Sequence, residues 1–241
     1  MADLEHNETG PAGIGSEPGR AGLSRRGVIT ASAVAAGAGL ASVPAVAEAK
    51  VTGQAVSLGP PGATTVEFRG RVLQSGNAGH TFTSFGYLIR ASHAKKAGLF
   101  SGTPISESTA LLTAYATGLL QSRTVDMAVH SIDIVGTMTV YQRETPGASF
   151  GNPSSFKVGK PVAVYRMTLQ DILTVFATDR GLPTLTGDML QTAAHSLSGP
   201  LAGQTFGKNG TRLRFFATGL GQRTSPTPSA ELEIAGNWSI E

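Results

Sequence analysis

Long stretches of β-forming residues, separated only by short breaks, constrain the fold of this sequence more than any other feature. From residue 64 onward, β-branched and aromatic residues run in segments that end at Gly, Pro, Asn or Ser, as expected for strands joined by turns. No helical pattern of about 12 residues or more separates these segments. We therefore predict eight strands, over residues 64–75, 81–91, 108–120, 125–142, 161–177, 185–195, 211–219 and 230–240.

Alternating apolar and polar positions identify the buried face of several of these segments. Because successive side chains of a strand point to opposite faces, apolar residues of one parity mark the side that packs inward. The predicted inward faces carry Leu232, Ile234, Trp238 and Ile240 in the last segment, Ile132, Ile134, Met138 and Val140 in residues 125–142, and Tyr165, Met167, Leu169, Leu173 and Val175 in residues 161–177.

The length of the segments favours one architecture over another. Long strands without helices between them pair antiparallel. Eight such strands tilt and close readily, and the interior of an eight-stranded barrel has room for side chains or for one small ligand. We therefore predict an all-β fold, a closed antiparallel eight-stranded β-barrel, with a β-sandwich as the alternative.

The segment before the strands carries a motif of another kind. The stretch Ser24-Arg25-Arg26-Gly27-Val28-Ile29 resembles the twin-arginine signal of exported bacterial proteins. An uncharged run follows it and ends in small residues at Ala47 and Ala49, which match signal-peptide cleavage sites. The resemblance implies that the twin-arginine translocation machinery is a partner. It also implies that the folded protein is secreted, or is extracytoplasmic in the cell envelope.

The uncharged run over residues 27–47 has an alternative interpretation as a membrane anchor. It is long enough, but Gly, Ser, Thr and Pro44 dilute its hydrophobicity, so we expect cleavage and no stable membrane anchor. We expect a cleavable signal peptide over residues 1–49, a Gly/Pro-rich linker over 50–63, and a single β-barrel domain over 64–241.

The residue types present exclude several chemistries. The chain has no Cys, which excludes thiolate metal sites and cysteine nucleophiles. No His pair has the spacing of a local metal motif, and no hydrolase or nucleotide-binding motif is complete, so we expect no metal and no cofactor. Residues 50–241 contain 16 Lys and Arg against 11 Asp and Glu, scattered along the chain, and we expect no nucleic-acid partner.

Four polar residues on the predicted inward faces are the candidate ligand-binding residues. Asp126 and His130 share the even face of residues 125–142, and Tyr165 and Asp171 share the odd face of residues 161–177. If both faces line a barrel interior, these side chains converge in an apolar pocket, the usual form of a small-molecule site. Alternatively, the two aspartates lie solvated near strand ends, and His130 is a half-buried residue with a hydrogen-bond partner.

The succession of long strands, with LLTAYATG at residues 111–118 followed by HSIDIVGT at 130–137, resembles the layout of allene oxide cyclase and dirigent-type barrels. The resemblance is one of architecture and includes no diagnostic motif. It implies a barrel cavity in which a cyclase acts or in which radical coupling is steered. No functional residue of those families is carried over to this chain.

Three functions remain open from the sequence. The first is a secreted β-barrel that binds a small apolar or amphipathic molecule, whose identity the sequence does not give. The second is a cyclase- or isomerase-type enzyme, in which an apolar barrel holds the substrate and one or two polar groups perform acid–base chemistry. The third is a structural or surface-interaction protein. A cavity that contains the candidate residues would favour the first two, and a fully packed interior would favour the third.

Overall fold

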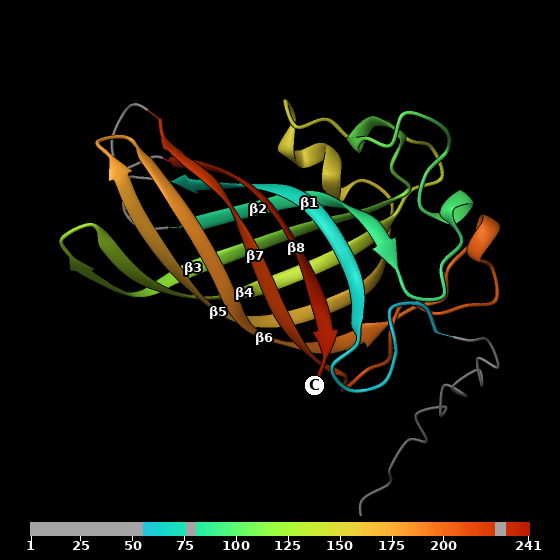
Figure 1. Ribbon diagram of the computed structural model, residues 1–241. Coiled ribbons are helices and arrows are strands. Elements are labelled where there is room, and N and C mark those ends of the chain that lie inside the picture. Colours follow the sequence, from blue (N-terminus) through green and yellow to red (C-terminus); the bar gives the residue numbers. More distant parts are fainter. Residues whose placement is uncertain (1–54, 76–80, 225–229) are drawn as a thin grey trace, which may run out of the picture. The chain divides into compact units, whose positions relative to one another are not determined.

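The computed structural model describes residues 55–75, 81–224 and 230–241, which form a closed, up-and-down antiparallel β-barrel (Figure 1). Each strand pairs with its neighbour in sequence, and β1 pairs with β8 to close the sheet. The predicted barrel is thus confirmed, and the sandwich is excluded. The strands are β1 (Thr64–Ser75), β2 (Thr81–Ala91), β3 (Leu112–Asp126), β4 (Val129–Gln142), β5 (Lys160–Ala177), β6 (Arg180–Ala194), β7 (Arg212–Arg223) and β8 (Ala230–Ile240).

The predicted strand boundaries are confirmed at β1, β2 and β8. The prediction began β6 at residue 185 and ended β7 at residue 219, whereas β6 begins at Arg180 and β7 ends at Arg223. The predicted division between 108–120 and 125–142 is also wrong. Residues 125 and 126 belong to β3, and β4 begins only at Val129, so Asp126 and His130 lie on different strands. A two-residue turn separates these strands, and Met127 adopts a left-handed backbone there with φ 49°. Such turns usually contain Gly, Asn or Asp at the left-handed position, and Met127-Ala128 shows no such signal.

The barrel interior is filled by the residues that the alternation placed inward. Trp238 and Ile234 of β8 are buried, as are Tyr165 and Leu169 of β5. Trp238 lies between two other rings, with centroid distances of 6.1 Å to Phe68 and 5.6 Å to Tyr165. Gaps of only about 30 and 50 Å³ interrupt this packing along the middle of the barrel. The middle is therefore a packed core.

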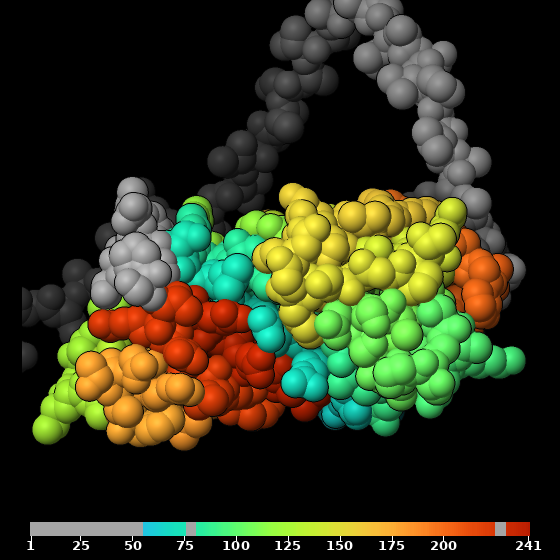
Figure 2. Space-filling view, turned by 90° about the horizontal axis from the view of Figure 1, so that it is seen from above, coloured from blue at the N-terminus to red at the C-terminus, as the bar shows by residue number. Residues whose placement is uncertain are grey.

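The two ends of the barrel differ in the length of their connections. At one end, here called the loop end, lie the connections 92–111, 143–159 and 195–211. Figure 2 shows part of the 143–159 connection, in yellow, next to part of the 92–111 connection, in green. At the opposite end, the hairpin end, β3–β4 and β5–β6 are joined by turns of two residues. The loop end contains the short 3-10 helices η1 (Lys96–Gly98), η2 (Glu107–Thr109), η3 (Pro153–Lys157) and η4 (Gly199–Leu201).

A short segment before β1 also packs at the loop end. Val56 is fully buried, and its N–H donates to the carbonyl of Thr205 at 2.9 Å, while the N–H of Gly207 donates to the Val56 carbonyl at 2.8 Å. Ser57 beside it is buried as well. Part of the segment that we expected to be a linker, residues 55–63, thus contributes to the packing at this end.

Glycines at inward positions allow neighbouring strands to approach closely. A Cβ atom at Gly219 would collide with the carbonyl oxygen of Glu233 on β8, and one at Gly136 with the carbonyl oxygen of Thr117 on β3. Glycines that let strands bend and approach one another are a general means of closing a small barrel. The sequence shows these glycines, but the collisions depend on the pairing of the strands.

Replacing Gly219 with alanine should lower the free energy of unfolding by about 1–3 kcal/mol, because the added methyl group forces the β7 and β8 backbones apart. Gly221→Ala is the matched control on the same strand. A Cβ there would lie 3.4 Å from the Gly181 carbonyl oxygen, an ordinary contact, so its stability should stay close to that of the wild type. Urea denaturation measures both. An equal loss in both variants would contradict the role of close strand approach.

Candidate functional site

A cavity of about 280 Å³ lies at the hairpin end of the barrel. Its apolar wall is formed by inward side chains, among them Phe82, Ile132 and Leu232. Charged and polar groups line it toward the strand ends. This volume is near the lower limit for small-molecule pockets, which range from about 300 to 1,000 Å³. The polar and charged lining residues used below are Arg123, His130, Asp171, Asp179, Arg180 and Arg223.

The pairing of β4 and β5 brings two of the four candidate residues together in this cavity. Ile132 lies opposite Asp171, and His130 lies opposite Leu173. His130 and Asp171 are thus diagonal neighbours on one face of the sheet, a distance that side chains can span. Both line the cavity.

Asp171 is an acid in an apolar setting. Its side chain is buried, and its Oδ1 accepts a hydrogen bond from the Thr184 N–H at 3.1 Å. Burial raises the pKa of the Asp171 carboxyl to about 6, although the bond from Thr184 acts in the opposite direction. Asp171 therefore exchanges its proton near neutral pH, where few carboxyl groups do.

The partner of His130 determines its tautomer. The Arg123 guanidinium lies 2.9 Å from His130 Nδ1, and a guanidinium only donates hydrogen bonds. Nδ1 is then the acceptor, and the neutral ring carries its proton on Nε2. Burial, followed by the charges of Arg123 and Arg223, lowers the pKa of His130 from its usual value. At neutral pH His130 is thus a neutral N–H donor.

The other two candidate residues lie outside the cavity. Asp126 is exposed at the end of β3, where it pairs with Val129 across the turn, so the prediction that it shares a face with His130 is wrong. Tyr165 is fully buried in the core against Trp238, six residues along β5 from Asp171. Burial raises the pKa of the Tyr165 hydroxyl, and the nearby Ser57 hydroxyl offsets this only in part.

The arginines of the cavity were missed by the sequence analysis, and a bulge explains the case of Arg123. Inward positions on β3 have even numbers as far as Leu120, which lies opposite Ile134. The register then shifts between Leu120 and Ser122, so that Arg123 lies opposite the inward Ile132. One extra residue in a strand exchanges its faces. Because the turn at Met127-Ala128 contains no Gly, Asn or Asp, the sequence contains no signal for this change of face.

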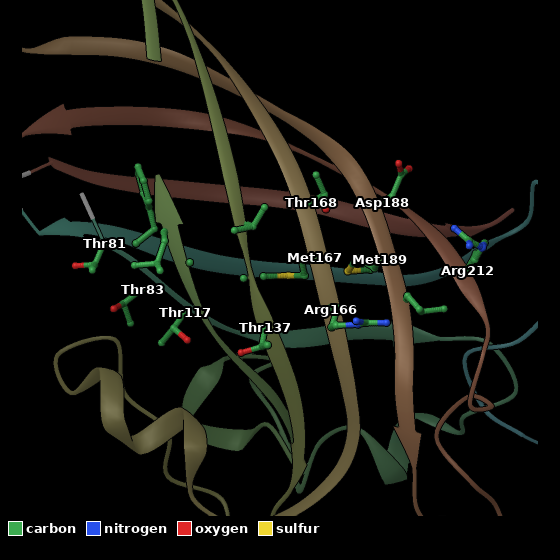
Figure 3. A pocket seen from close by; sticks show the side chains of 16 residues that line it. Thr81, Thr83, Thr117, Thr137, Arg166, Met167, Thr168, Asp188, Met189 and Arg212 are labelled. Carbon is green, nitrogen blue, oxygen red and sulfur yellow. The ribbon is translucent and has the colours of Figure 1, made fainter. Parts of the chain in front are cut away.

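A larger hollow of about 910 Å³ lies on the outer surface of the barrel wall. Strand pairing places Thr83, Thr117 and Thr137 side by side on β2, β3 and β4, with Arg166 next to them on β5 (Figure 3). The charged residues that line it, Arg166, Asp188 and Arg212, are all exposed, so the hollow contains no buried acid. The smaller cavity, which contains Asp171 and His130, is therefore the candidate functional site.

Metal sites and membrane-spanning helices were sought in residues 55–75, 81–224 and 230–241. In these ranges, no three His, Cys, Asp or Glu side chains are grouped so that they hold a metal ion. Within the same ranges there is no helix whose length and hydrophobicity would let it cross a bilayer. The predicted export signal, with Arg25, Arg26, Ala47 and Ala49, lies outside the described residues.

No protein-family model, no curated protein and no solved structure matches this chain. The resemblance to allene oxide cyclase and dirigent-type barrels, and the twin-arginine signal, therefore stay predictions. The function has to be argued from the cavity and its residues.

The Asp171→Asn variant should be more stable than the wild type at neutral pH. The folded state holds the Asp171 proton up to about pH 6, whereas the ordinary pKa is 3.8, so the stability of the wild type falls as pH rises between these values and stays lower above them. Asparagine does not ionise, so above pH 6 the free energy of unfolding of the variant should exceed that of the wild type by up to about 3 kcal/mol. Its side-chain oxygen can still accept the Thr184 N–H.

Thermal or urea unfolding of both proteins between pH 3.5 and 8 tests this expectation, because this range covers the Asp171 pKa of the unfolded and of the folded state. Below about pH 4 the difference should vanish, because Asp171 is then neutral. The exposed Asp126→Asn variant is the control and should show no such gain. An Asp171→Asn variant that is less stable than the wild type at pH 8 would contradict the unfavourable burial of this charge.

Proposed function

We propose that this protein binds a small amphipathic molecule in the cavity at the hairpin end of the barrel. The observation that carries this proposal is a cavity of about 280 Å³ with an apolar wall and with His130 and Asp171 in its lining. Ligand sites commonly combine an apolar surface with a few polar groups that orient the ligand. The protein would perform this function outside the cytoplasm if the twin-arginine signal acts as expected.

The packing limits the size of the ligand and its position. Beyond the cavity, the barrel interior offers only gaps of about 30 and 50 Å³. A ligand therefore occupies the hairpin end and does not extend along the whole barrel. Its apolar part would contact Phe82, Ile132 and Leu232, and its polar part would face the charged groups near the strand ends.

An isomerase-type activity in the same cavity is the second candidate function. It is supported by the pairing of an acid that titrates near pH 6 with a neutral imidazole whose Nε2 carries a proton. Acid–base catalysis requires groups that exchange protons near the working pH. A binding protein requires no such group. If a bound compound is found, its conversion by the wild type and its binding without conversion by His130→Gln and Asp171→Asn would favour the enzyme.

Native mass spectrometry of the protein purified from its own host tests binding. We expect a bound mass that is lost on denaturation. The Gly221→Leu variant should lose this mass, because Gly221 lines the cavity and a Cβ there meets only ordinary contacts, which lets the leucine side chain fill the space. Gly102→Leu is the matched control, since Gly102 lies in the 92–111 connection with open space around it.

The two variants make the result specific. A bound mass that persists in Gly221→Leu would place the ligand outside the cavity and contradict the proposal. A wild type without any bound mass, which also fails to bind apolar dyes, would favour the third function, a structural or surface-interaction protein.

A further inference from the structure

We propose that the ligand of this cavity carries one oxyanion group, such as a carboxylate or a sulfonate, on a compact apolar body, and that Arg180 and Arg223 bind this group. The inference rests on the proposed function, because it names the chemical class of the ligand in the same cavity. Guanidinium groups bind oxyanions, planar or tetrahedral, through paired, charge-assisted hydrogen bonds.

Three arginines from three strands line the cavity: Arg123 from β3, Arg180 from β6 and Arg223 from β7. Arg180 is the first residue of β6 and Arg223 is the last residue of β7, so the two lie at adjacent strand ends. Arg223 is also close enough to His130 for its charge to act on the imidazole. The three positive charges therefore surround one volume at the hairpin end.

These arginines have no carboxylate partner among the described residues. The ion pairs of the described ranges involve Arg71, Arg90 and Arg214, all outside the cavity. Within the same ranges Arg123 bonds to the neutral imidazole of His130, and no side-chain hydrogen bond of Arg180 or Arg223 is formed. Each guanidinium therefore has donors that a ligand can use.

The acids of the cavity do not neutralise these charges. Asp171 already accepts the Thr184 N–H and forms no ion pair with an arginine among the described residues. Even when Asp171 and Asp179 are both ionised, two acids face three arginines in the lining. Asp179 lines the cavity, but no arginine lies within ion-pair distance of its carboxylate among the described residues. Residues 76–80 and 225–229, which lie outside the described residues, contain no Asp or Glu. The cavity thus has an excess of positive charge.

Cavity size and wall chemistry define the rest of the ligand. A volume of about 280 Å³ accommodates a compact ring system or a short branched chain. The apolar wall lies deeper in the barrel than the arginines, since Ile132 and Phe82 are buried while Arg123 and Arg223 are exposed. The apolar body would enter first, and the oxyanion would stay near the strand ends.

Two dyes with the same rings test the inference: anilinonaphthalene sulfonate, which carries one sulfonate, and N-phenylnaphthylamine, which is uncharged. Fluorescence titration of the full-length protein should show about ten-fold tighter binding of the sulfonate dye, as expected for one charge-assisted pair. Arg180→Gln and Arg223→Gln should each raise the dissociation constant of the sulfonate dye about ten-fold and leave that of the neutral dye unchanged. Gly221→Leu should abolish the binding of both.

The control is Arg90→Gln, which removes an exposed arginine at the loop end that pairs with Glu67; it should change neither affinity. Thermal unfolding of each variant shows that it is folded, which excludes dye binding to unfolded chains. Equal affinities for the two dyes, or a sulfonate preference that survives both arginine substitutions, would overturn the inference while the proposed binding function stands. If the wild type binds neither dye, the inference and the proposed function both fail.

Discussion

The pairing of β1 with β8 is the constraint on which the rest of this structure depends. It gives every strand two neighbours, so that no edge is left with unpaired N–H and C=O groups. A closed sheet of eight strands has a narrow interior, and close strand approach at glycines such as Gly136 and Gly219 makes it narrower still. Closure thus produces the packed middle around Trp238 and, with it, the small size of the remaining cavity.

Up-and-down order then determines where that cavity lies. Alternate connections lie at opposite ends, and the long ones all fall at the loop end, where buried residues such as Val56, Leu201 and Phe206 fill the space. The two-residue turns at the hairpin end supply no such side chains. The polar groups near these turns are therefore held in an apolar space and next to one another. This position explains why Asp171 retains its proton so far above the usual range of an aspartic acid.

The same electrostatic setting bears on both functions that we weighed. Guanidinium groups without carboxylate partners suit an anionic ligand, whereas a buried acid beside a neutral imidazole suits proton transfer. The two are compatible, because a ligand anchored by Arg180 and Arg223 would place its apolar body near Asp171 and His130. A binding function requires only that the two arginines hold the ligand. Catalysis requires in addition that the ligand places a reactive group beside Asp171 and His130.

Local alternation along the chain was enough to predict the barrel, the limits of β1, β2 and β8, and the inward positions of Trp238, His130 and Asp171. The alternation also placed both residues on inward faces, and the pairing of β4 and β5 makes them diagonal neighbours. The positions of Asp126, Tyr165 and Arg123 depended on structural features that alternation along the chain does not reveal. A turn without Gly or Asn at Met127 and Ala128 removed Asp126 from the strand of His130, and a bulge after Leu120 turned Arg123 inward. Tyr165 lies on the correct face but too deep along β5 to reach the cavity. Alternation is a local property of the backbone and can be read from residue order, whereas turns, bulges and depth are set by how each strand pairs with its neighbours.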